Sequence, residues 1–229
     1  MHIQRYVIMN NMSINDLSGN LAPSGERRGR GRRPAAEVRD SVLAAAAALL
    51  FEEGLAAVTF DKVAAHAGSS KTTLYKWWPS AGALAAEAYF NRVEHALEFP
   101  DTGDIEADLR TQLRAFVQLL TGEGAGVVIA ELIGAAQTDP ALRSAFSAAY
   151  SRPRRDLAVA ALQRARDRGQ LRGGFSLEII VDQLWGACYH RLVIPDEPLT
   201  LDFADELVHN VLHGAAAISV GPPQGDSRK

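Results

Sequence analysis

The sequence has few of the residues that build disulfide-linked, membrane-spanning or β-rich proteins. Its one cysteine, Cys188, excludes an internal disulfide and suits a reducing cytoplasm. No apolar run approaches the roughly 20 residues that a membrane span needs, and the first residues lack the apolar core and cleavage site of a signal peptide. Aromatic residues make up only 7% of the chain and β-branched alternation is nearly absent, whereas alanine is abundant. An all-α protein without a membrane partner is therefore expected.

The chain also lacks the motifs on which enzymes depend. It has no glycine-rich phosphate loop, no nucleophile elbow and no cysteine cluster. His209 and His213 are four residues apart, which is metal-ligand spacing on a helix, but Asn210 replaces the glutamate of an HExxH protease. Zinc hydrolysis is thereby excluded, and the pair is interpreted as part of a hydrated subunit rim, with a structural metal as the alternative. No enzymatic activity, cofactor or metal is expected.

Charge is distributed unevenly along the chain. The net charge is −3, yet residues 1–34 hold six arginines against two acidic residues. Arginine alternates with glycine over Arg27–Arg33, and such a thin basic arm can lie in a DNA minor groove. Its expected DNA contacts are Arg30, Arg32 and Arg33; the other interpretation is a solubilising tail. Residues 1–34 and 221–229 are expected to be disordered.

The most informative segment is Thr59–Ser80, which has the layout of a helix-turn-helix. Thr59 is a good N-cap, and Gly68 ends the first helix after an apolar face at helical spacing. Ser69 or Ser70 can cap the second helix, which Pro79 ends. The polar side chains expected to contact DNA are Thr59, Ser70, Lys71, Thr72, Thr73, Tyr75 and Lys76. Lysine can bond guanine, threonine a base edge or methyl group, and tyrosine a phosphate oxygen; the alternative is a helical hairpin with no DNA role.

Residues 38–98 resemble the DNA-binding domain of the TetR family of one-component transcriptional repressors. The resemblance rests on a long alanine-rich helix ending in Phe51-Glu52-Glu53-Gly54, and on Val58-Thr59-Phe60, Val63-Ala64, Ala67-Gly68, Lys71, Thr73-Leu74-Tyr75, Trp78-Pro79-Ser80 and Ala83-Leu84. The family often has a phosphate-binding lysine just after the Ser80 position, where this chain has Ala81 and Gly82.

The resemblance implies a helix-turn-helix domain over residues 35–98 and a helical ligand-binding and dimerisation domain over residues 99–220. It further implies a homodimer that binds a palindromic operator in double-stranded DNA and is released by a small-molecule effector, with a hydrophobic ligand as the default. The alternative is a DNA-binding or architectural protein that needs no ligand.

The pattern of apolar residues predicts the remaining helices. Long helices are expected over Ala36–Glu53, Ala81–Leu97, Leu109–Leu120, Val127–Ala136, Pro140–Arg168, Ser176–Val193 and Leu201–Ala217. A kink is expected at Pro153. The segment Val127–Ala136 is apolar on nearly all sides and is expected to be buried.

Two apolar stripes on the last two helices predict pairing with a second subunit. The interface residues expected are Leu184, Cys188, Leu207, Val208, Val211 and Leu212. The residues expected to line a ligand pocket are Phe116, Leu120, Ile133, Phe146, Tyr150, Trp185 and Tyr189, with Trp185 and Tyr189 the best candidates, although plain core is the more common role for any one of them. A buried Glu131 could meet a cationic ligand or pair with an arginine.

Overall fold

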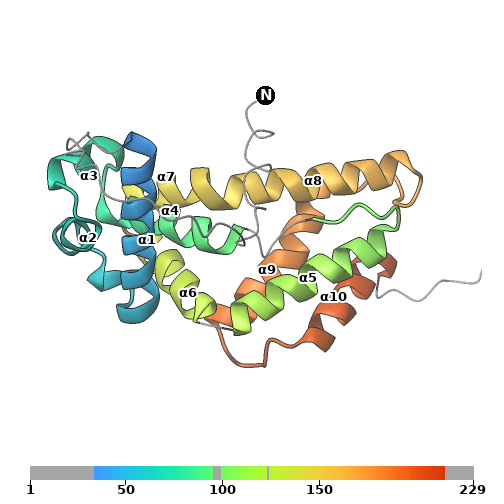
Figure 1. Ribbon diagram of the computed structural model, residues 1–229. Helices are drawn as coiled ribbons and strands as arrows, with labels where there is room; N and C mark the ends of the chain where they lie inside the picture. The colour runs from blue at the N-terminus through green and yellow to red at the C-terminus, as the bar shows by residue number, and fades with distance from the viewer. Residues whose placement is uncertain (1–33, 95–98, 123, 215–229) are drawn as a thin grey trace, which may run out of the picture. The chain divides into compact units, whose positions relative to one another are not determined.

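The computed structural model describes residues 34–94, 99–122 and 124–214, and every regular element in these ranges is a helix (Figure 1). The all-α prediction is confirmed. The helices are α1 (Ala35–Glu53), α2 (Phe60–Ala67), α3 (Lys71–Trp77), α4 (Ala81–Val93), α5 (Ile105–Thr121), α6 (Ala125–Ala136), α7 (Pro140–Phe146), α8 (Arg152–Asp167), α9 (Leu177–Val193) and α10 (Leu201–His213). Two short turns, η1 (Leu55–Ala57) and η3 (Ser147–Ser151), complete the order. The expected arm contacts Arg30, Arg32 and Arg33 and the expected disordered tail lie outside the described residues.

Side-chain caps fix where the helices of the helix-turn-helix begin. The Thr59 hydroxyl accepts a hydrogen bond from the Lys62 N–H at 3.3 Å, and the Ser70 hydroxyl accepts one from the Thr73 N–H at 3.2 Å. Gly68 follows α2 with φ of 59°, a left-handed conformation that costs glycine little. These local signals place α2 and α3 on either side of a short turn.

The first four helices enclose a core of their own. Leu50, Val63, Leu74 and Leu84, one from each helix, have no exposed surface. Burying a leucine side chain stabilises a fold by about 1.5–3 kcal/mol, so these contacts dominate the packing of the short helices.

Trp78, directly after α3, is fixed by a polar cluster at the edge of this core. Its indole N–H donates to the Glu87 carboxylate of α4 at 2.8 Å, and Arg39 of α1 reaches the same carboxylate at 2.6 Å. The Arg39 guanidinium also lies over the Trp78 ring. Three helices are thereby held in register around the end of α3.

Helix α4 belongs to both halves of the described chain. It packs on α1 and also on α7 and η3 (Figure 1). Gly82 lies at the start of α4, where an added Cβ would come within 3.3 Å of the Leu142 Cβ of α7. The residues that replace the family's lysine after Ser80 therefore lie where α4 and α7 approach closely.

The C-terminal helices pack around α5. Helix α10 lies along α5, where the Arg114 guanidinium donates to Asp205 at 2.7 Å, and α8 packs on α9. The turn from α5 to α6 requires Gly126, because a Cβ there would meet the Leu120 carbonyl oxygen at 2.0 Å.

Among the described helices, no single one has both the length and the apolar character of a membrane span, although α5 and α6 meet that test together as a pair bent by 86°.

The long helix predicted from Pro140 to Arg168 is interrupted by a turn of π-helix. Helix α7 ends at Phe146, the π turn η3 covers Ser147–Ser151, and α8 starts at Arg152. Pro153 has no N–H and its ring would crowd the carbonyl four residues earlier, which lies in that turn. The widened turn relieves this conflict, so the irregularity expected at Pro153 appears just before it.

Two other predictions about helices are corrected. Helix α10 ends at His213 because Gly214 has a φ of 75°, and the residues from 215 to Ala217 that the prediction included lie outside the described ranges. Helix α6 is not buried on all sides, since Val127 is largely exposed. The apolar character of α6 exceeds what its neighbours can cover.

Three of the six residues expected at a subunit interface belong to the core of the single chain. Leu184, Cys188 and Val208 have no exposed surface. They face other helices of the same chain and cannot touch a second subunit directly. Leu207, Val211 and Leu212 keep part of their surface exposed. Three of the six residues expected to contact a second subunit are therefore covered by helices of the same chain.

The burial of Cys188 predicts slow thiol chemistry. Burial raises the pKa of the Cys188 thiol to about 12. At pH 8 a thiol-reactive dye should label the native protein about a thousandfold more slowly than the protein unfolded in guanidinium, because only the thiolate reacts. Arg172→Cys adds an exposed thiol and serves as the control. Rapid labelling of native wild-type protein would contradict this packing.

Candidate DNA-binding surface and ligand cavity

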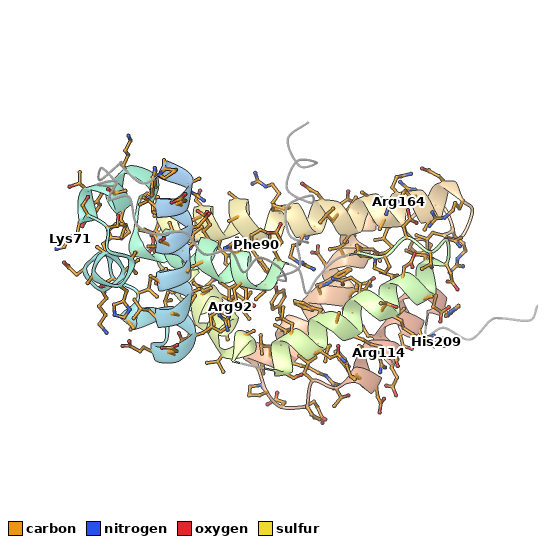
Figure 2. All side chains as sticks on the ribbon, viewed as in Figure 1. Lys71, Phe90, Arg92, Arg114, Arg164 and His209 are labelled. Carbon is orange, nitrogen blue, oxygen red and sulfur yellow. The ribbon has the colours of Figure 1, made fainter. Side chains whose placement is uncertain are left out.

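The exposed face of α3 carries four of the seven helix-turn-helix side chains predicted to contact DNA. Lys71, Thr72, Tyr75 and Lys76 are exposed, while Leu74 turns into the core. Figure 2 shows Lys71 at the outer edge of the helix-turn-helix. The Tyr75 ring packs edge-on against Phe60 with centroids 4.5 Å apart, which orients its hydroxyl although the side chain is 64% exposed. This surface fits a major groove.

The threonine and serine hydroxyls on this surface have structural partners. Thr59 and Ser70 act as the caps of α2 and α3, and the Ser70 and Thr73 hydroxyls share a hydrogen bond at 2.9 Å. A hydroxyl has both a donor and lone pairs, so capping leaves capacity for a DNA contact. Thr72 is exposed and lies on the side of α3 away from the core.

Lys71 forms an ion pair with Asp61 of α2. The hydrogen bond and negative charge of Asp61 raise the pKa of the Lys71 ammonium. Both side chains are largely exposed, so water and salt screen the pair. A guanine or phosphate that approaches α3 competes with Asp61 for the ammonium group.

A cavity of about 180 Å³ lies between α5, α8 and α9. Three of the predicted pocket residues, Tyr150, Trp185 and Tyr189, line it. Phe146 and Phe116 pack against the rings of Tyr150 and Tyr189 from behind, with centroids 5.2 and 5.4 Å apart. Leu120 and Ile133 lie in the surrounding core and not in the cavity wall.

Several lining residues were not predicted from the sequence. They include Phe99, Gln112, Arg154, Leu157, Ala158 and Val181. The signal for Gln112 was present: it lies three residues after Leu109 and four before Phe116, on the apolar face of α5. A polar residue on a face that packs into a core indicates a buried polar site.

The two tyrosines of the cavity are bonded to each other. The hydroxyls of Tyr150 and Tyr189 are 3.1 Å apart. Burial raises the pKa of Tyr150, and burial together with the neighbouring Tyr150 raises the pKa of Tyr189 well above its usual value. Both phenols therefore stay neutral, and the cavity wall carries hydroxyl groups without a phenolate charge.

At the rim of the cavity, α8 and α9 are joined by an ion pair. The Arg155 guanidinium donates to both carboxylate oxygens of Asp182, one of them at 2.9 Å. The hydrogen bond from Arg155, together with its positive charge, lowers the pKa of Asp182. Arg154 lies 5.9 Å from the centre of the Tyr150 ring on the same side.

Glu131 connects α6 to the DNA-binding helices. The Leu55 N–H donates to the Glu131 carboxylate at 2.8 Å, and an added Cβ on Gly54 would lie 3.4 Å from that group. Glu131 is exposed, is not in the cavity wall, and its recorded bond is to the backbone. The burial expected for Glu131 is therefore wrong, and its partner among the described residues is a backbone N–H and not an arginine.

The two histidines of α10 lie beside a carboxylate of α5. Ligand atoms of Glu106, His209 and His213 lie within 4.8 Å of one another, the one such group of potential metal ligands among the described residues. The carboxylate is also engaged by Arg110 at 2.7 Å and by the His213 ring at 3.1 Å. The His213 bond links α5 to α10, and Figure 2 shows His209 far from Lys71.

The fold and this surface define a helix-turn-helix transcriptional regulator. Residues 42–88 match the family model of bacterial regulatory proteins of the tetR family, and residues 99–211 match the tetracyclin repressor-like C-terminal domain. The chain therefore belongs to the TetR family of transcriptional regulators.

Known relatives agree with this assignment. The HTH-type transcriptional regulator YdeS of Bacillus subtilis is 34% identical over 190 residues, which cover 83% of this chain and 96% of YdeS. Rv1556 of Mycobacterium tuberculosis is 32% identical over 79% of this chain and 88% of its own length. The crystal structure of the TetR family regulator SCO0332 is 54% identical, with a TM-score of 0.73 over 79% of this chain and all of that chain.

The exposed face of α3 predicts how individual substitutions affect DNA binding. Lys71→Ala should weaken a selected operator about ten- to hundredfold and relax one base position in each half-site. Tyr75→Phe should weaken specific and non-specific DNA alike, because a phosphate contact is lost. Fluorescence anisotropy titration checks both, with Arg172→Ala, a distant exposed charge, as the control. Wild-type affinity and base preference in both variants would mean that α3 does not read DNA.

Proposed function

We propose that this chain is a repressor that binds a palindromic operator as a homodimer and is released by a small, mainly apolar ligand. One observation carries the proposal: a single chain combines an exposed polar recognition helix with a partly open cavity lined by aromatic side chains, and α4 contacts the elements around both. The alternative, a DNA-binding protein that needs no ligand, leaves the cavity unexplained.

The cavity supports the small-molecule part of the proposal. Its walls are mostly apolar and aromatic with a few polar groups, as in sites that bind organic ligands. Proteins of this fold include one named the flavonoid-responsive regulator FrrA, 21% identical with a TM-score of 0.56, and FadR of Bacillus subtilis, 14% identical and solved with stearoyl-CoA. At such identities the likeness concerns the fold alone, so the ligand class must come from this chain's own cavity.

The surface proposed for subunit pairing is the exposed side of α9 and α10. Ile179 is 58% exposed, and with Leu207 and Val211 it lines a groove between these helices. Phe175, just before α9, adds a further exposed ring. An apolar surface of this kind is typical of an interface. It replaces Leu184, Cys188 and Val208, which the chain itself buries.

The proposed release mechanism runs through Tyr150 and α4. The Tyr150 ring lines the cavity and packs edge-on against Tyr89 of α4, with centroids 5.8 Å apart. Helix α4 in turn packs on α1 in the DNA-binding half. A ligand that favours one position of Tyr150 would thereby favour one position of α4, to the extent that it binds the two states differently.

Selection of bound fragments from a random DNA pool, together with light scattering, tests the proposal. The wild type should be dimeric at micromolar concentration and enrich a palindrome with half-sites about one helical turn apart or a small multiple of it. Leu207→Asp should give monomers that lose the palindrome, because an unpaired charge is buried at the contact. Val127→Asp, also at an exposed apolar position, is the matched control. Enrichment without any sequence preference would favour the architectural alternative.

The hydrogen bond of Glu131 to Leu55 predicts how a substitution at Glu131 affects folding stability, operator affinity and ligand binding. Glu131→Ala should lower the free energy of unfolding by about 1 kcal/mol, since the Leu55 N–H loses a charged acceptor. It should also change operator affinity without changing ligand binding in the cavity, because Glu131 is outside the cavity wall. Denaturant unfolding and operator titration measure the two effects. Glu131→Gln keeps an acceptor oxygen and should behave nearly as wild type; equal effects of both variants would contradict a hydrogen-bonding role.

A further inference from the structure

Gln112 is a buried polar residue without a partner among the described residues. Its side chain is 1% exposed, and neither its amide nitrogen nor its amide oxygen has a hydrogen bond. The same residue lines the cavity between α5, α8 and α9. Buried amides are nearly always bonded in native proteins, so an orphaned pair of donor and acceptor calls for an explanation.

The neighbouring polar groups do not supply that partner. The Tyr150 and Tyr189 hydroxyls bond each other, and Arg155 is taken up by Asp182 at the rim. Gln112 therefore holds an unpaired N–H donor and an unpaired carbonyl acceptor within the wall of a mainly apolar cavity, whose charged lining residues are Arg154, Arg155 and Asp182. A molecule that fills the cavity without matching both groups would leave one of them unpaired, which is costly in a buried site.

The volume of the cavity and the side chains that line it limit the size and shape of the ligand. A cavity of about 150 Å³ is enough to hold benzene, so 180 Å³ accommodates one aromatic ring. Tyr150, Trp185 and Tyr189 supply flat faces for ring packing. Gly186 and Ser151 line the cavity as well and are exposed, so a second ring can extend toward the surface.

The hydrogen-bonding groups of Gln112 favour a molecule that both donates and accepts. The two phenols are neutral and Arg155 pairs with Asp182, while Arg154 adds a positive charge to the lining. A carboxylate only accepts hydrogen bonds, so it would leave the Gln112 oxygen unpaired and facing a negative charge. An amine only donates and would leave the Gln112 nitrogen unpaired. A neighbouring N–H and C=O on one edge match both groups at once.

We propose that the effector is a neutral, planar ring compound with an amide edge, meaning a lactam, a cyclic imide or an aromatic carboxamide, and that Gln112 binds this edge through two hydrogen bonds. This inference rests on the proposed function, since it assigns the chemistry of the same ligand cavity. It makes Gln112 the residue that determines specificity, while the aromatic side chains supply the greater part of the contact surface.

A matched series of bicyclic compounds tests the proposal on the full-length protein. The probes are isoquinolin-1(2H)-one, its N-methyl derivative, isocoumarin, in which oxygen replaces the N–H, and naphthalene. Binding is measured by calorimetry and by the fluorescence of Trp185, with Trp185→Phe identifying the signal of that residue among the three tryptophans. The wild type should bind isoquinolin-1(2H)-one about ten- to hundredfold more tightly than the other three compounds.

Substitution of Gln112 should abolish this preference without unfolding the protein. Gln112→Leu removes two unpaired buried polar atoms, so its melting temperature should equal or exceed that of the wild type, and it should bind all four compounds within about threefold of one another. Gln112→Met, which keeps the length of the side chain but has neither an amide donor nor a carbonyl acceptor, should also lose the preference and covers the case in which the leucine variant folds poorly. Gln118→Leu, an exposed glutamine on the same helix, should keep the wild-type preference.

The outcomes separate the ligand class from the regulatory function. Equal binding of all four compounds by the wild type, or a preference that survives both Gln112 variants, would overturn the amide-edge proposal while the cavity remains a ligand site. Failure of every compound to bind would overturn the amide-edge proposal alone, because four bicyclic probes do not test other small apolar ligands. Operator binding, measured on the same samples, reports separately on whether the chain is a DNA-binding regulator.

Discussion

The packing of Tyr89 is the contact on which the rest of the structure depends. Its ring stacks on Phe51 of α1 with centroids 6.0 Å apart, and meets Tyr150 of the π turn edge-on. Tyr150 bonds Tyr189 of α9, which packs on Phe116 of α5. One series of rings therefore runs from the DNA-binding core to the centre of the C-terminal helices, so that displacing any one ring disturbs its neighbours on both sides.

This series also explains why the chain has an irregular element where a simple helix would do. The π turn places Tyr150 against both Tyr89 and the cavity, and Pro153 just after it prevents an ordinary α-helical continuation. The Tyr89 hydroxyl is buried without a partner among the described residues, and burial raises its pKa. Two destabilising features, the π turn and the unpaired Tyr89 hydroxyl, therefore lie at the junction between the two halves of the described chain. A regulator needs two states of similar stability at such a junction.

Local signals in the sequence were sufficient for the helix-turn-helix. Thr59, Ser70 and Gly68 act as the caps and turn that their residue types predict, because capping involves groups only two or three residues apart. The all-α fold and most helix boundaries follow from the same short-range rules. Contacts such as Glu131 with Leu55 join residues 76 positions apart, and no local pattern reports on them.

The apolar stripes show the limit of such reasoning most clearly. A stripe reveals that a helix face is covered but not by what. On α9 the face with Leu184 and Cys188 is covered by the chain's own helices, and Ile179 is left exposed. To tell the covered face of α9 from its exposed face, one must know how many helices surround α9, and that depends on the whole fold. The same holds for the cavity: Trp185 and Tyr189 were predictable as aromatic neighbours on one face, but Phe99 and Val181 were not.

Gln112 brings these constraints together. On the apolar face of α5, leucine would pack without any unpaired polar atom, and the fold alone gives no reason for an amide there. A group that makes the empty protein less stable becomes favourable only when something supplies its missing hydrogen bonds. Because the cost disappears on binding, the same residue contributes both affinity and selectivity for a matching ligand. A core position whose unpaired amide costs folding free energy is thus informative about what the cavity binds.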